Sequence, residues 1–171
     1  MKKLLLGFLF ASFALTGFGQ MVKLTPSNAS GDRIKFGSAV SISGDYLAVG
    51  APDEDIAGDD NLGSVYVYRR NNGTWSQSAK LTSPTNDTYK QFGNGVATDG
   101  DYIAVGSFND LQGGQVYIYT RSGNNWSKTA DIVPSPAAVS FGSAIAFMGD
   151  MVLIGARGDR NGEGSVYVYR R

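Results

Sequence analysis

One dense group of acidic residues in this chain is suited to binding a cation. Five carboxylates fall within eight residues, and an asparagine follows them: Asp53, Glu54, Asp55, Asp59, Asp60 and Asn61. Carboxylate and amide oxygens are the ligands that Ca²⁺ prefers. The candidate ligands for Ca²⁺ are Asp53, Asp55 and Asp59, but their spacing matches no complete metal-loop pattern. The group therefore leaves three interpretations open: a calcium site, a surface for a basic partner, or a solvated loop. No other cofactor is expected.

Other chemistry is limited by residue types that the chain lacks. It has no Cys and no His. Disulfides, thiolate or imidazole zinc sites, Cys nucleophiles and Ser-His-Asp relays are therefore excluded. Glycoside cleavage needs only two carboxyl groups at a set separation, but the two glutamates, Glu54 and Glu163, lie far apart in the sequence. We predict a non-catalytic protein and keep a glycoside-active enzyme as a remote alternative.

An internal repeat positions the acidic group. The string GSVYVYRR occurs at residues 63–70 and again at 164–171, and GQVYIYTR lies between them at 114–121. The first two copies begin 51 residues apart, and the last two begin 50 apart. A period near 50 is typical of repeat proteins in which each unit buries its apolar faces against its neighbours.

Each copy predicts four antiparallel strands. A copy opens with Phe-Gly, at Phe36, Phe92 and Phe141, and continues with alternating apolar residues, a Gly-Asp hairpin and a second strand. A polar loop and the Val-Tyr strand follow, and a fourth strand opens at Trp75 or Trp126. The recurrence of the two tryptophans favours core packing over sugar stacking. The predicted fold is all-β: a β-propeller of four-stranded antiparallel blades, with three repeats at about 36–81, 92–133 and 141–171.

The predicted binding surface combines the loops between second and third strands with those between fourth and first strands, because loops on a rigid scaffold commonly carry function. The loops between second and third strands span residues 53–61, 107–113 and 157–163. Beyond the acidic group, the candidate ligand-binding residues are Asn109, Asp110, Arg157, Asp159 and Glu163. Arg157-Gly158-Asp159 is the tripeptide that integrins recognise, but a chain rich in Gly and Asp produces it by chance. We treat it as accidental.

The two ends of the chain predict how the repeats close. The third copy stops at Arg171, where its fourth strand should begin, and MVKL at Met21–Leu24 resembles the end of a fourth strand. We predict that residues 20–24 complete the third blade. Three blades are fewer than the roughly four to eight that close a ring. Two alternatives stay open: a homodimer whose six blades form one ring, each N-terminal strand completing the other chain's last blade, or a piece of a longer protein.

Residues 1–19 are predicted to be a signal peptide. Lys2 and Lys3 precede an apolar run from Leu4 to Leu15, which is too short to span a membrane. The chain has 15 basic and 15 acidic residues, so loss of the two lysines leaves 13 against 15. No basic cluster indicates a nucleic-acid surface. We predict that residues 20–171 are secreted or lie on the cell surface, with no membrane span and no nucleic-acid partner.

The Phe-Gly and Gly50-Ala51-Pro52 elements resemble the FG-GAP repeat, the blade unit of the integrin α-subunit head and of many secreted bacterial proteins. The second element reads Gly106-Ser107-Phe108 in copy two and Gly155-Ala156-Arg157 in copy three. The resemblance implies an extracellular adhesion or binding module for a protein or carbohydrate. A structural assembly repeat, or a fragment of a larger surface protein, is the alternative. The family's calcium loop is reduced here to Gly44-Asp45 and its equivalents, so that site is not carried over.

Overall fold

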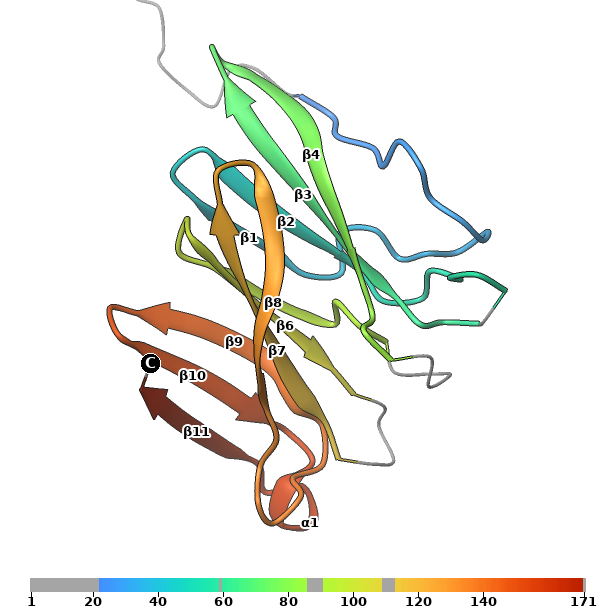
Figure 1. Cartoon of the computed structure of the whole chain (residues 1–171). Coiled ribbons are helices and arrows are strands. Elements are labelled where there is room, and N and C mark those ends of the chain that lie inside the picture. The colour runs from blue at the N-terminus through green and yellow to red at the C-terminus, as the bar shows by residue number, and fades with distance from the viewer. Residues whose placement is uncertain (1–21, 59, 86–90, 109–112, 171) are drawn as a thin grey trace, which may run out of the picture.

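The computed structural model describes residues 22–58, 60–85, 91–108 and 113–170, which fold into three antiparallel sheets (Figure 1). We call the sheets blades one, two and three. Blade one contains four strands that follow each other in space as in sequence: β1 (Val40–Ser43), β2 (Tyr46–Ala51), β3 (Ser64–Asn71) and β4 (Thr74–Thr82).

Blades two and three repeat this order. Blade two contains β5 (Gly95–Thr98), β6 (Tyr102–Ser107), β7 (Gln115–Ser122) and β8 (Asn125–Ile132). Blade three contains three strands, β9 (Phe141–Met148), β10 (Met151–Ala156) and β11 (Ser165–Arg170), and the short α1 (Asp159–Gly162) precedes β11. The predicted all-β fold with four-stranded antiparallel units is confirmed for blades one and two. Blade three ends at its third strand.

The strands form where apolar residues alternate, and glycine makes the hairpins. Gly44 and Gly149 open the two-residue turns before β2 and β10 with φ of 56° and 59°, a region that glycine adopts without a Cβ penalty. In β3, Val65 and Val67 point to one face of blade one and Tyr66 and Tyr68 to the other, because successive side chains of a strand alternate. Each blade therefore has a valine face and a tyrosine face.

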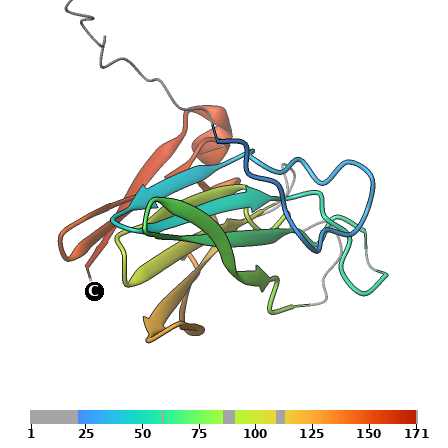
Figure 2. The same ribbon diagram turned by 90° about the horizontal axis from the view of Figure 1, so that it is seen from above.

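The core lies between stacked blades. The valine face of blade one packs on the tyrosine face of blade two, and the valine face of blade two packs on the tyrosine face of blade three. Figure 2, seen from above, shows the three sheets lying one over another. The Phe of each Phe-Gly pair packs against the tyrosines of its own blade: Phe92 lies 5.7 Å from the ring centroid of Tyr117 in a tilted arrangement and 6.2 Å from that of Tyr119 in an edge-on one.

Glycines set how closely the blades approach. A Cβ added to Gly50 of β2 would lie 3.0 Å from the carbonyl carbon of Gly93 and closer still to its oxygen. Gly106 of β6 meets Gly142 in the same way. Gly93 and Gly142 thus rest directly on the second-strand glycine of the preceding blade, a close approach that only glycine permits.

The three blades form an open stack, so a closed propeller is not present within one chain (Figure 1). Val22–Leu24 belong to no strand of this chain, and Leu24 packs against the tyrosine face of blade one. Residues 20 and 21 lie outside the described part of the chain, so completion of blade three by residues 20–24 stays a prediction. In the described part of the chain, no helix is long and apolar enough to cross a membrane.

Candidate functional site

The acidic loop between β2 and β3 folds against the segment that precedes blade one. The Asp53 amide donates to the Ile34 carbonyl at 3.4 Å, and the Asp55 amide donates to the Ser30 carbonyl at 3.3 Å. The loop projects at the right of Figure 1, next to the N-terminal segment. Two segments that are distant in sequence therefore form one surface at this end of the blade.

Glu54 lies beneath this surface, which corrects its prediction as a ligand-binding residue. Its side chain is 0% exposed, and its carboxylate accepts hydrogen bonds from the Ser30 amide at 2.7 Å and from the Tyr66 hydroxyl at 2.9 Å. Ser64 donates a further hydrogen bond, and the Lys80 ammonium forms an ion pair with Glu54 at 2.8 Å. A buried carboxylate persists only when it is paired and hydrogen-bonded in this way, so Glu54 is unavailable to an external ligand.

The Glu54 network anchors the loop to the blade. Tyr66 and Ser64 belong to β3, Lys80 to β4, and Ser30 to the N-terminal segment. Burial, and then the hydrogen bond to Glu54, raise the pKa of the Tyr66 hydroxyl well above its usual range. Charge-assisted hydrogen bonds are stronger than neutral ones, so four residues from three parts of the chain are held to one carboxylate.

The other acidic-loop residues that the structure describes stay at the surface. Asp53 pairs with Lys35 at 2.6 Å and is 16% exposed, and Asp55 accepts the Asn61 amide at 3.1 Å. Asp60 is exposed. An open hollow brings these groups together with two residues that the sequence did not single out; its lining is Asp32, Arg33, Asp53, Asp55, Asp60 and Asn61.

The candidate calcium ligands are not assembled in the described residues. Asp59 lies outside the part of the chain that the structure describes, and the ammonium of Lys35 neutralises Asp53. Within the described ranges, no group of three or more acidic side chains is placed to hold a metal ion. The arrangement of Asp53 and Asp55 thus fits a charged surface for a partner, whereas Ca²⁺ binding stays a prediction.

Of the other predicted site residues, those that the structure describes do not line this hollow. Asn109 and Asp110 lie outside the described residues. Arg157 stacks its guanidinium on the Phe108 ring, 5.7 Å from the centroid. Glu163 is exposed and pairs with Arg160 at 3.3 Å.

Asp159 of the Arg-Gly-Asp tripeptide faces its own blade. It accepts hydrogen bonds from the Tyr167 hydroxyl at 2.8 Å and from the Arg160 amide at 2.9 Å. Hydrogen bonds from Ser165 and then Tyr167 hold the pKa of Asp159 below its usual range. The carboxylate is thus engaged by β11, which supports the interpretation that the tripeptide is accidental.

Asp159 and Glu54 occupy the same place in their repeats. Each lies four residues after the second-strand glycine, Gly155 or Gly50, and each accepts from the first tyrosine of the third strand. Asp110 has the same spacing from Gly106 in copy two. The shared spacing of an acidic residue from the second-strand glycine is the sequence signal of the anchors Glu54 and Asp159.

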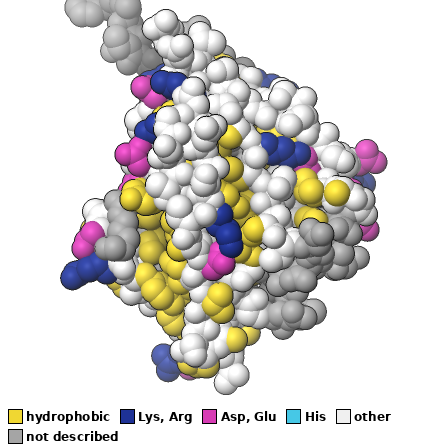
Figure 3. Space-filling view, in the orientation of Figure 1, with side chains coloured by type: hydrophobic (Ala, Val, Ile, Leu, Met, Phe, Trp, Pro, Cys, Tyr) yellow, Lys and Arg dark blue, Asp and Glu magenta, His cyan; other side chains and the backbone are white. Residues whose placement is uncertain are grey.

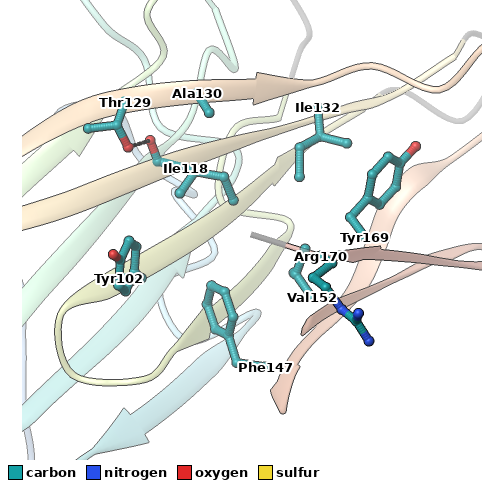
Figure 4. Close-up of a pocket in the computed structure, with 9 residues that line it drawn as sticks. All are labelled: Tyr102, Ile118, Thr129, Ala130, Ile132, Phe147, Val152, Tyr169 and Arg170. Atoms are coloured by element: carbon teal, nitrogen blue, oxygen red, sulfur yellow. Dashed lines mark hydrogen bonds between the residues drawn. The ribbon is translucent and has the colours of Figure 1, made fainter. Parts of the chain in front are cut away.

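An apolar cleft of about 300 Å³ opens between blades two and three (Figure 4). Hydrophobic side chains gather over this region, whose lining comes from β6, β7 and β8 of blade two and from β9, β10 and β11 of blade three (Figure 3). In the first interface, Trp126 of blade two packs edge-on against Tyr46 of blade one, at 5.8 Å between ring centroids. Tyr102, the counterpart of Tyr46, lines the cleft. The cleft thus lies at the place in the second interface that corresponds to the Tyr46–Trp126 contact of the first.

Stacked antiparallel sheets of four, four and three strands, joined by repeated Phe-Gly contacts, define an all-β repeat protein with propeller-like blades. The FG-GAP repeat model matches residues 18–68, 75–119 and 126–169, which is most of the chain. The chain therefore belongs to the FG-GAP repeat family, as its motifs predicted. A search of curated proteins found no match.

The limits of the three matches define the repeating unit. Two of the matches begin at Trp75 and Trp126, where fourth strands open, and end at Tyr119 and Tyr169 in the next third strands. The first match begins at residue 18 and ends at Tyr68. The family unit thus joins an outer strand to the following three strands, and in the first unit the described residues 22–24 stand at the sequence position of the end of that outer strand.

Proposed function

We propose that this chain is a secreted, non-catalytic adhesion or binding module that engages an extracellular protein or carbohydrate through loops at one end of its blades. Membership of the FG-GAP repeat family supports this class, because these repeats occur in adhesion and binding modules. The two glutamates support the absence of catalysis. Glu54 is buried in blade one and Glu163 is exposed in blade three, so they form no pair of carboxyl groups at one site.

The acidic hollow is the observation that carries the proposal. Asp32, Asp55 and Asp60 contribute carboxylates to it, against the single guanidinium of Arg33. The buried Glu54 network fixes the loop from below, so little ordering is needed when a partner binds. A basic segment of an extracellular protein fits this surface best, because complementary charge steers association and selects partners.

An immobilised oligolysine peptide tests the hollow as a cationic probe. We expect Asp55→Asn together with Asp60→Asn to weaken binding about tenfold, with a steep dependence on salt. The matched control is Asp45→Asn with Asp150→Asn, which removes the same charge from hairpins at the other end of the blades. Equal loss in both double variants would contradict a localised site. A glycan array run in parallel reports carbohydrate binding, and glycan binding that survives the Asp55 and Asp60 changes would move the site elsewhere.

Export is tested separately. We expect protein recovered from the medium of an expressing bacterial culture to begin at Gln20 by mass spectrometry. Recovery only inside cells, with residue 1 retained, would contradict the predicted signal peptide.

A further inference from the structure

We propose that two copies of this chain join head to tail, with the valine face of blade three of one copy on the tyrosine face of blade one of the other, and close a ring of six blades. The partner is thus a second copy. The inference does not depend on the proposed function. It rests on a comparison of the two blade interfaces inside the chain with the two faces that the chain leaves uncovered.

The uncovered valine face belongs to blade three. Val65 and Val67 of blade one are 0% exposed because blade two covers them. Their counterparts in the identical string of blade three, Val166 and Val168, are 68% and 60% exposed. Exposed β-branched residues on a flat strand face mark an interaction surface.

Two glycines of blade three reproduce the contact points that receive a Phe-Gly pair. In blade two, Gly106 and Gly114 lie against the backbone of Gly142 and Phe141, with the nearest carbonyl carbons 2.9 Å from the place of a Cβ. Gly155 and Gly164 are their counterparts in blade three. A Cβ on Gly155 would meet only Ala144, at 3.4 Å, and one on Gly164 would have no neighbour closer than 3.6 Å. Within one chain, close packing does not require glycine at either position.

Blade one presents the Phe-Gly pair that fits these positions. Phe36 lies 5.5 Å and 6.3 Å from the ring centroids of Tyr66 and Tyr68, close to the 5.3 Å and 6.3 Å of the corresponding pairs in blade three. Gly37 has the same left-handed backbone as Gly93, with φ of 96° in both, but a Cβ there would meet nothing within 4 Å. Val40, on the same face, is 64% exposed, whereas its counterpart Val96 in the first interface is 7% exposed.

The N-terminal segment already lies where the preceding blade's outer strand would end. Lys23-Leu24-Thr25 has the sequence of Lys80-Leu81-Thr82, the end of β4. The Tyr68 hydroxyl donates to the Thr25 carbonyl at 2.8 Å, as the Tyr119 hydroxyl donates to the Thr82 carbonyl at 3.4 Å. Leu24 packs on the tyrosine face of blade one, and Leu81 on that of blade two. The segment therefore lies beside blade one as β4 lies beside blade two.

In the ring, this segment adds the fourth strand of the other copy's blade three. Lys80 of β4 pairs with the acidic anchor Glu54 of its own blade, and Asp159 is the anchor of blade three. Lys23, which is exposed, would pair with Asp159 of a second copy. Two such head-to-tail contacts give six blades, within the range that closes a propeller.

Light scattering behind size exclusion tests the ring on the purified full chain. We expect twice the mass of one chain, constant over a wide range of concentration. A mass of one chain at every concentration would overturn the interface, and a mass that rises beyond two chains would overturn closure.

Gly155→Ala tests the contact without harming the single chain, because its Cβ meets only Ala144 there. In the ring, the same Cβ would strike Gly37 of the other copy. We expect a variant that is folded by circular dichroism and has the mass of one chain by light scattering. The control Val133→Ser changes an exposed valine away from the face and should leave the dimer intact. A Gly155→Ala variant that stays dimeric would overturn the proposal.

Reversing the charges of Lys23 and Asp159 in separate variants tests whether these two residues meet across the contact between two copies. Lys23→Asp alone and Asp159→Lys alone each place like charges together in both contacts, so we expect each to weaken dimerisation at least about tenfold. Mixing the two variants restores opposite charges in both contacts and should restore the dimer. If the mixture is no more dimeric than its components, Lys23 does not meet Asp159 and the proposed register is wrong.

Discussion

Blades one and three contain the same eight residues, GSVYVYRR, with opposite burial. In blade one the two valines are 0% exposed, whereas in blade three they are 68% and 60% exposed. Both segments are third strands paired with a second strand in the same register. Local sequence therefore determines the strand and which side chains share a face, while the neighbouring blade determines whether a face is buried.

The acidic anchors show the same difference. Glu54 and Asp159 accept from equivalent tyrosines, but only Glu54 has a lysine from a fourth strand and a covering segment above it. One repeated residue thus becomes a buried ion pair in blade one and a half-buried carboxylate in blade three. The fourth strand and the covering N-terminal segment therefore bury the carboxylate of blade one, whereas the corresponding carboxylate of blade three stays partly exposed.

The largest effect is expected from Lys80→Met. This change leaves Glu54 charged, buried and without its ion-pair partner, so we expect the free energy of unfolding to fall by about 3 kcal/mol. Lys128→Met is the matched control, because its pair with Asp131 is solvent-exposed and should cost less than about 1 kcal/mol. Urea unfolding followed by Trp fluorescence measures both. Similar losses would mean that burial of the Glu54 pair does not matter for stability.

The next largest effect is expected from Gly106→Ala. Its Cβ would force blades two and three apart at Gly142, so we expect the free energy of unfolding to fall by about 2 kcal/mol. Gly155→Ala at the counterpart position should leave the unfolding of the single chain within about 0.5 kcal/mol of the parent. The pair is compared by urea unfolding in dilute solution. Equal tolerance at both positions would argue against glycine contacts as the determinant of blade spacing.

Val67→Ala and Val168→Ala sharpen the comparison within the shared string. We expect a loss of about 2 kcal/mol at Val67, from lost burial and the cavity left behind. At Val168 we expect less than about 0.5 kcal/mol in dilute solution, since its side chain is 60% exposed. Thermal unfolding measures both variants at several protein concentrations. A loss at Val168 that appears only at high concentration would indicate that a second copy covers it.

The smallest effect concerns pH. Burial raises the pKa of Tyr66 above that of an unfolded tyrosine, so the unfolded chain loses this proton first. Its contribution to stability is therefore complete below about pH 10 and declines above that value. We expect Tyr66→Phe, although less stable at neutral pH, to lose less stability than the parent between pH 9 and pH 11. If the stability of Tyr66→Phe falls as steeply as that of the parent over this pH range, groups other than Tyr66 cause the loss of stability at alkaline pH.

Much of the fold was predictable because its rules are local. The alternation of Val65 to Tyr68 gave two apolar faces, and Gly44 gave the hairpin that its positive φ confirms. The candidate site was less predictable. The sequence located the acidic loop but not the burial of Glu54, and it gave no sign that Asp32 and Arg33 would share the hollow. Those facts depend on contacts between segments more than twenty residues apart.

The sequence by itself determined the repeat, the strands, the turns and the family, because hydrophobic period and turn chemistry act over a few residues. Only the tertiary structure decided that Glu54 is an anchor, that the Phe-Gly glycines are contact points, and that blades one and three end the stack with complementary uncovered faces. The reason is physical: burial and ion pairing depend on what a neighbouring blade or strand brings within contact distance, and a local pattern does not specify that neighbour.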